Sequence, residues 1–187
     1  DLRQLDWNVY ARLERLFDIF RPKKITHATM EFFDIAGQAP AKGKAMEPQV
    51  MQTLRNADSL VAVLDAFSDG AEPERDLAAV TDEFAFGDLV VATGRLERIE
   101  KELRSGKNDH LLLEKGVLER CRAVLEDGGS LRSLAFDGEE EKSIRGYRFL
   151  SLKPLLVVVN ISEADQSAGK AGEFERRFEG TGSARCL

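Results

Sequence analysis

Residues 155–163, LLVVVNISE, are the stretch that decides how the chain is expected to fold. Five apolar residues without a polar break are typical of a central strand in a parallel sheet, whose two faces are both covered. A second continuous run, DSLVAVLDAF at residues 58–67, has the same character. A third, at residues 28–35, mixes β-branched and aromatic residues. With a predicted helix at residues 50–55 between two of these strands, the pattern indicates an α/β fold with a mainly parallel sheet.

A long segment of different character lies between the predicted strands at residues 58–67 and 155–159. Its apolar residues recur three, four and seven positions apart, which predicts two helices joined by the loop RSGKND. We expect these helices to pair as an antiparallel hairpin along a seam formed by Leu89, Leu96, Leu103, Leu111, Leu118 and Leu125. The predicted organisation is therefore a helical, coiled-coil-like insertion at residues 75–147 within an α/β domain made of residues 1–74 and 148–187. A further amphipathic helix is predicted at residues 9–20.

The segment DIAG at residues 34–37 is the only aspartate-x-x-glycine in the chain, and it lies at the end of a predicted strand. In a nucleotidase, an aspartate in this pattern reaches Mg²⁺, usually through water, and the glycine amide meets the γ-phosphate. Asp34 is therefore a candidate metal ligand and Gly37 a candidate phosphate contact. The alternative is an ordinary strand-to-turn junction, because the pattern fixes only two residues.

The segment NISE at residues 160–163 is the only asparagine-x-x-acid pattern, and it directly follows a predicted buried strand. Asn160 can hold a base-binding loop and contact a purine, while Glu163 can accept hydrogen bonds from base donors. The alternative is a turn in which Asn160 caps a following helix. Both motifs are predicted to end strands at the edge where ligands bind in open α/β sheets, and this shared position favours a ligand site.

Longer stretches of the chain resemble the Obg-like ATPases of the YchF type. The run RLERLFDIFRPKKITHATMEFFDIAG at residues 12–37 is similar to the family pattern RL..L..I..PKK...AT.EF.DIAG. Further similar segments follow in the same order: RNADSLVAVLDAF, PERDL, EEEK and KPLLVVVNISE. The resemblance covers nearly the whole chain, and its most specific parts are PKK...AT.EF.DIAG and KP.....N.SE.

This resemblance implies a Ras-like P-loop nucleoside triphosphatase domain, here a partial nucleotide-binding (G) domain, interrupted by the helical hairpin. The implied activity is hydrolysis of ATP or GTP with Mg²⁺, in a cytoplasmic, translation-linked role with the ribosome or ribosomal RNA as partner. Asn160 and Glu163 match the family's asparagine-x-x-glutamate, which goes with a preference for ATP or with relaxed specificity. Ser183 and Ala184 are similar to the family's last base-binding motif.

The chain departs from the family pattern at three places. It contains no G-x-x-x-x-G-K-[ST] loop to hold the phosphates and no switch threonine. No apolar strand precedes Ser183 and Ala184, so we expect the sequence to omit flanking or internal segments of a longer protein. Gln38 stands where the family has an apolar residue, and glutamine at this place orients the attacking water in Ras-like GTPases. Gln38 is thus a candidate catalytic residue, with a solvated loop glutamine as the alternative.

Composition restricts the classes of partner. The formal net charge of −6 gives no global attraction to DNA or to an anionic membrane, and the apolar runs are too short to span a bilayer. A local basic face is predicted on the hairpin, where cations recur at helical intervals among glutamates: Arg95, Arg98, Lys101, Arg104 and Lys107. Such a face is either a solubilising surface or a contact for RNA or the ribosome. The alternative function is accordingly a nucleotide-independent module that binds a protein or the ribosome through the hairpin.

Overall fold

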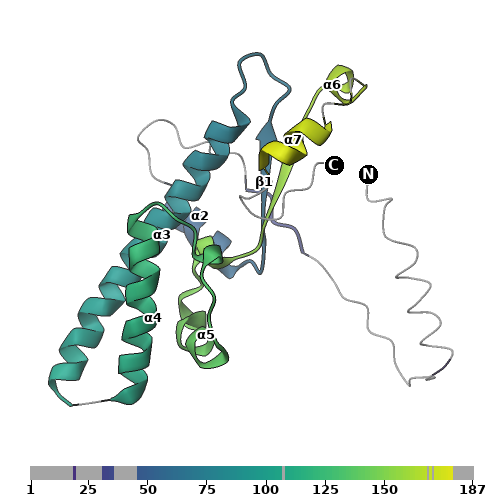
Figure 1. Cartoon of the computed structure of the whole chain (residues 1–187). Coiled ribbons are helices and arrows are strands. Elements are labelled where there is room, and N and C mark those ends of the chain that lie inside the picture. The colour runs from purple at the N-terminus through teal and green to yellow at the C-terminus, as the bar shows by residue number, and fades with distance from the viewer. Residues whose placement is uncertain are drawn as a thin grey trace. The chain divides into compact units, whose positions relative to one another are not determined.

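The computed structural model of the chain describes residues 19, 31–35, 46–106, 108–167, 169 and 171–178. The chain divides into two compact units, Asp1–Asp34 and Ile35–Leu187, which are described separately. The helix predicted at residues 9–20 lies outside the described residues except for Ile19, which is helical. Every helix and strand discussed below belongs to the second unit and is drawn in colour in Figure 1.

Two parallel strands, β1 (Leu60–Asp65) and β2 (Leu155–Asn160), form the described sheet. They pair in register from Leu60 opposite Leu155 to Asp65 opposite Asn160. The strands and the surrounding helices make this an α/β structure, as the apolar runs predicted. Since parallel strands run in one direction, both finish at the same edge, and the loops that follow them lie next to each other.

The described residues cover one face of this sheet. Its covered side chains pack against the start of α3 (Pro73–Arg104) and the end of α7 (Ala171–Phe178) in a core formed by Leu60, Leu64, Leu77, Phe84, Leu150, Leu155, Val157, Val159 and Phe178. On the other face, Val61 is 49% exposed and Val63 is 70% exposed. The expectation that residues 58–67 are buried on both faces is therefore wrong for the described structure. Successive side chains along a strand point to opposite faces of the sheet, and no described residues cover the face that carries Val61 and Val63.

Residues 31–35 form no strand, which corrects the predicted strand at residues 28–35 over its described part. A β-branched and aromatic segment becomes a strand only when its backbone N–H and C=O groups find partners on a neighbouring strand. The described sheet consists of β1 and β2 alone. Phe32 and Phe33 are 75% and 68% exposed, so no described core covers this segment.

Helices α3 and α4 (Asp109–Glu126) pack against each other and run in opposite directions (Figure 1). Their shared core contains all six residues of the predicted leucine seam: Leu96, Leu118 and Leu125 are buried, and Leu89, Leu103 and Leu111 are partly buried. The side chain of Asn108 caps α4 by accepting hydrogen bonds from the N–H groups of His110 and Leu111. The chain leaves α4 through Gly128, whose φ of +72° is a left-handed conformation that glycine adopts without strain.

Shorter elements connect the helix pair to the sheet. Helix α2 (Pro48–Asn56) precedes β1, and α6 (Glu163–Ser167) follows β2. Between α4 and β2 lie α5 (Gly138–Ile144) and three 3-10 turns, η1 (Leu131–Ser133), η2 (Arg145–Tyr147) and η3 (Leu150–Leu152). Helix α5 begins with a capping box between Asp137 and Glu140.

A buried carboxylate joins three of these elements. Asp88 of α3 is fully buried and accepts hydrogen bonds from Arg55 Nη1 of α2 at 2.9 Å and from Ser151 N and Oγ of η3, each at 2.8 Å. Arg55 also donates to the carbonyl oxygens of Tyr147 and Arg148. This arrangement fixes α2, and thereby the start of β1, against α3.

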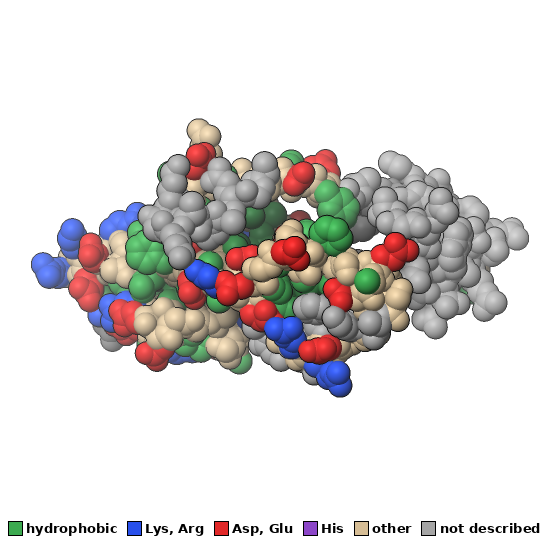
Figure 2. Space-filling model, turned by 90° about the horizontal axis from the view of Figure 1, so that it is seen from above, with side chains coloured by type: hydrophobic (Ala, Val, Ile, Leu, Met, Phe, Trp, Pro, Cys, Tyr) green, Lys and Arg blue, Asp and Glu red, His purple; other side chains and the backbone are tan. Residues whose placement is uncertain are grey.

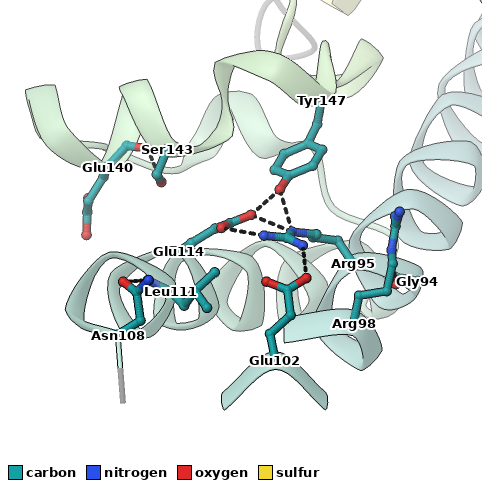
Figure 3. A network of polar contacts seen from close by, with 10 residues as sticks. All are labelled: Gly94, Arg95, Arg98, Glu102, Asn108, Leu111, Glu114, Glu140, Ser143 and Tyr147. Atoms are coloured by element: carbon teal, nitrogen blue, oxygen red, sulfur yellow. Dashed lines mark hydrogen bonds and ion pairs between the residues drawn. The ribbon is translucent and has the colours of Figure 1, made fainter. Parts of the chain in front are cut away.

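A second polar network, drawn in Figure 3, lies between α3, α4 and η2. Arg95 donates from Nε and Nη2 to the two carboxylate oxygens of Glu114, at 2.8 and 3.0 Å, and from Nη1 to Glu102 at 2.9 Å. Tyr147 donates its hydroxyl to Glu114 and accepts from Arg95 Nε at 3.0 Å. Arg95 therefore does not belong to the predicted basic face.

Of the remaining residues predicted for that basic face, three are exposed along the outer side of α3: Arg98, Lys101 and Arg104. Lys107 lies outside the described residues. Glu97, Glu100 and Glu102 are exposed on the same helix, so the cations share this surface with carboxylates.

Candidate functional site

The carboxyl ends of β1 and β2 meet at Asp65 and Asn160, the last residues of the paired strands. The N–H of Ala66 donates to the Asn160 carbonyl oxygen at 2.9 Å, which holds the two following loops together. Asp65 Oδ1 accepts hydrogen bonds from the N–H groups of Phe67 and Ser68, at 2.8 and 3.1 Å. Hydrogen bonds from the Ser68 side chain and from these two N–H groups lower the pKa of Asp65. The Asp65 carboxylate thus stabilises the turn that follows β1.

Asn160 ends β2 and Glu163 begins α6, and both are exposed. Ser162 caps the helix, because the N–H of Asp165 donates to Ser162 Oγ at 3.1 Å and Ser162 Oγ donates to Asp165 Oδ2 at 2.9 Å. The alternative in which Asn160 is the cap is therefore wrong. Within the described part of the chain, no hydrogen bond or ion pair engages the side chain of Asn160 or Glu163. Among the described residues, this edge of the sheet thus carries an exposed amide and an exposed carboxylate, three positions apart, without a hydrogen-bond or ion-pair partner.

The other predicted site residues lie either in the first unit or outside the described residues. Asp34 is exposed and belongs to the first unit, whereas Asn160 and Glu163 belong to the second. Four predicted positions lie outside the described residues: Gly37, Gln38, Ser183 and Ala184.

Magnesium is the metal that the resemblance implies. Mg²⁺ takes oxygen ligands, and nucleotide enzymes usually hold it by one or two carboxylates together with phosphate oxygens and water. Asp34 is an exposed carboxylate and fits a water-mediated contact of this kind. In the described ranges, no group of three or more His, Cys, Asp or Glu side chains is placed to hold a metal.

Basic side chains gather at the opposite, amino edge of the sheet, which the sequence motifs did not indicate. Arg55, Arg145, Arg148 and Lys153 line a cavity of about 480 Å³ there. They come from segments separated by up to almost one hundred positions and form no motif. The only available signal was a lysine two residues before the start of β2.

The surface carries charges of both signs. Figure 2 looks down on the end of the molecule at which β1 and β2 finish, and acidic and basic side chains are interspersed over this face with hydrophobic side chains between them. Across the residues that the structure describes, no helix has both the length and the apolar character needed to cross a membrane.

Sequence comparison gives relatives over most of the chain. The ribosome-binding ATPase YchF of Haemophilus ducreyi is 32% identical over 162 residues, which span 81% of this chain and 44% of that protein. The protein of the same name from Escherichia coli O157:H7 is also 32% identical over 162 residues, with the same coverage of both chains. These similarities assign the chain to the YchF family. Obg-like ATPase 1 of Oryza sativa subsp. indica is 27% identical over 169 residues, or 85% of this chain and 43% of that protein.

Structural comparison agrees on the fold. The structure of the Schizosaccharomyces pombe YchF GTPase matches with a TM-score of 0.75 at 22% identity, over 94% of this chain and 52% of that one. The chain thus shares the YchF fold and spans about half the length of the YchF proteins that it matches. No family model matches it.

Proposed function

We propose that this chain forms part of a YchF-type nucleoside triphosphatase, which binds ATP or GTP and hydrolyses the γ-phosphate. The observation that carries the proposal is the pair Asn160 and Glu163. Both side chains are exposed, have no described partner, and follow a parallel strand at the edge where open α/β sheets bind ligands. The names of the relatives, ribosome-binding ATPase and YchF GTPase, support a nucleotide as that ligand.

Asn160 and Glu163 would contact the base. A carboxylate is a hydrogen-bond acceptor only, so Glu163 pairs with base N–H donors. Adenine offers its exocyclic amino group and guanine offers a ring N–H and an amino group, so Glu163 is compatible with both. Ser183 and Ala184 would complete the contacts to the base. On these grounds, we propose ATP or GTP as the substrate.

The phosphate side of the site would be formed by the DIAG segment. Asp34 would hold Mg²⁺ through water, the Gly37 amide would meet the γ-phosphate, and Gln38 would orient the attacking water. Mg²⁺, when bound, would supply positive charge that neutralises the phosphates. The phosphates also need a loop of backbone amides and a lysine, and no G-x-x-x-x-G-K-[ST] occurs in this sequence. The proposed hydrolysis therefore belongs to a protein in which these residues are joined to such a loop.

We propose the ribosome or ribosomal RNA as the partner and the cytoplasm as the location. Residues 75–147 would be a helical insertion in a nucleotide-binding domain made of residues 1–74 and 148–187. Exposed cations on α3, at Arg98, Lys101 and Arg104, provide contacts that suit RNA phosphates. The same surface supports the second candidate, a module that binds the ribosome or a protein without nucleotide.

The test measures ATP and GTP affinity of the full-length protein by calorimetry. Asn160→Ala and Glu163→Ala should each weaken binding about tenfold, the effect of losing a hydrogen bond that involves a charged or well-placed polar group. Glu97→Ala, an exposed glutamate on α3, is the matched control and should bind as the wild type does. A full-length protein that binds ribosomes but neither nucleotide would favour the second candidate instead.

A further inference from the structure

The cavity at the amino edge of the sheet is separate from the proposed base site. Its walls come from the end of α2, the residues that precede β1, the α5–η2 segment, and the residues that precede β2. Lys153 lies two residues before the start of β2, whereas Asn160 ends that strand. The two sites therefore lie at opposite ends of the same strands.

The lining of this cavity carries an excess of positive charge. Four cations, Arg55, Arg145, Arg148 and Lys153, face two carboxylates, Asp58 and Glu141. Glu141 of α5 is paired with Arg145 of η2 at 3.5 Å, and an exposed pair of this kind contributes little to stability. The chain as a whole has a formal net charge of −6, so the positive charge of this lining is opposite in sign to that of the whole chain.

The charged groups of three of these residues are held in place by the backbone and by neighbouring side chains. Lys153 donates to the carbonyl oxygen of Ala57, and Arg148 donates to the side-chain oxygen of Asn56. Arg55 is anchored by the buried Asp88. Arg148 has a φ of +50°, a left-handed conformation that is uncommon for a residue other than glycine. Such a conformation persists where the surrounding structure imposes it, and it is more frequent at ligand sites.

Lys153 is partly buried and lies among charges of both signs. Burial is the largest cause that lowers the pKa of Lys153, and the charges of Arg148 and Arg55 lower it further, while Asp58 and Asp88 oppose the shift. An anion in the cavity would favour the charged form of this lysine and reduce the repulsion among the three cations.

The same cavity has an apolar wall. Ile144, Phe149 and Leu152 contribute to its lining beside the cations; Leu152 is partly exposed, whereas Ile144 and Phe149 are almost fully buried. The volume of about 480 Å³ lies within the range of small-molecule sites. A ligand that matches both parts has an anionic group with several acceptor oxygens and an attached apolar or aromatic body.

We propose that the cavity lined by Arg55, Arg148 and Lys153 binds a small organic phosphate, with the phosphate group on the cations and the organic group on the apolar wall. Guanidinium groups suit this ligand because their N–H groups match the spacing of phosphate oxygens. The site would act in addition to the proposed triphosphate site.

The test uses phenyl phosphate, a phosphate monoester without a nucleobase, with inorganic phosphate and phenol as companion probes. Calorimetry on the 187-residue chain should show phenyl phosphate binding more tightly than inorganic phosphate and phenol not binding. Lys153→Gln and Arg148→Asn should each weaken phenyl phosphate binding about tenfold. Asparagine is chosen because it tolerates the left-handed conformation. Arg122→Gln, at a partly exposed arginine of α4 outside the cavity, should have no effect.

Several results would overturn the proposal. They are wild-type affinity in both cavity variants while thermal unfolding shows them folded, equal binding of inorganic and phenyl phosphate, or no phosphate binding by the folded wild type. A short RNA that binds with the same dependence on Lys153, while phenyl phosphate does not bind, would assign the cavity to nucleic acid instead. Asn160→Ala should leave phenyl phosphate binding unchanged, so failure here and failure of the nucleotide proposal are distinguishable.

Discussion

Asp88 is the residue on which the joint between α2, α3 and η3 depends. Its carboxylate is fully buried and receives three hydrogen bonds from two partners, Arg55 and Ser151. The motif patterns did not indicate this contact, because Arg55 lies 33 positions from Asp88 and Ser151 lies 63 positions from it. An aspartate on a helix surface and one in a core have the same local pattern, so only the tertiary fold separates them.

Asp88→Ala should lower the free energy of unfolding by about 3–5 kcal/mol, because it leaves the Arg55 guanidinium with its ion-pair partner removed. Asp82→Ala is the matched control, since Asp82 is exposed on the same helix, and it should change stability by less than about 0.5 kcal/mol. Denaturant unfolding followed by circular dichroism measures both. Equal stability of the two variants would show that the buried ion pair contributes nothing.

Glu114 gives the stability of the helix pair a dependence on pH. Burial alone would raise the pKa of Glu114, but hydrogen bonds from Arg95 and Tyr147 outweigh it and the pKa lies below its ordinary value. Burial, together with the hydrogen bond to Glu114, raises the pKa of Tyr147 to about 12, so its hydroxyl remains a donor at neutral pH. A group whose pKa is lowered by folding stabilises the protein above its unfolded pKa, and this contribution is lost as the pH falls.

Glu114→Gln should therefore be less stable than the wild type at pH 7, and the difference should shrink as the pH falls below 4.5, the ordinary value for this glutamate. The measurement is the free energy of unfolding at a series of pH values. Glu97→Gln, at an exposed glutamate of α3, serves as the control and should follow the wild type throughout. A difference for Glu114→Gln that stays constant down to pH 3 would contradict the assigned ion pair.

At the scale of elements, the helix pair was the most predictable part of the chain. Leucine spacing alone identified all six seam residues, because a two-helix interface imposes a period that local sequence displays. Strand burial was less predictable. The apolar run at residues 58–67 looks the same whether one face of β1 is covered or both, and Val63 turned out to be exposed. Residues 31–35 have strand-like composition, but pairing requires a neighbouring strand that local sequence does not specify.

Asn108 tests the start of α4. Asn108→Ala removes the side-chain oxygen that accepts from the N–H groups of His110 and Leu111, and should cost about 1 kcal/mol of unfolding free energy. Asn108→Ser, which keeps an oxygen at the capping position, should retain most of the stability. Thermal unfolding of the three proteins measures the effect, and an alanine variant as stable as the serine variant would argue against the cap.

At the scale of the whole molecule, the family could be predicted from extended motif order, and sequence comparison supports it over 81% of the chain. Of the predicted site residues, the structure describes Asp34, Asn160 and Glu163. Asn160 and Glu163 were found from one local pattern that follows a strand. The basic cavity was not found, because Arg55, Arg148 and Lys153 meet only through packing of α2 against the segment that leads into β2.

Gln38 is the position where the chain leaves the family pattern and agrees with Ras-like enzymes. If Gln38 orients the attacking water, Gln38→Leu in the full-length protein should slow hydrolysis about tenfold or more, with nucleotide affinity nearly unchanged, since the contact matters mainly in the transition state. Single-turnover hydrolysis and equilibrium binding separate the two quantities. Hydrolysis at the wild-type rate by the leucine variant would end the catalytic assignment of Gln38.

The central claim, that these residues serve a Mg²⁺-dependent nucleoside triphosphatase, is tested most directly by phosphate release from ATP and GTP by the full-length protein and its Asp34→Ala variant. Release should require Mg²⁺ in the wild type and fall by about a hundredfold or more in the variant, because the metal-side carboxylate is lost. The Asp69→Ala variant, which changes an exposed aspartate after β1, should retain wild-type release. Wild-type rates in Asp34→Ala, or no Mg²⁺-dependent release of phosphate from either nucleotide, would contradict the account.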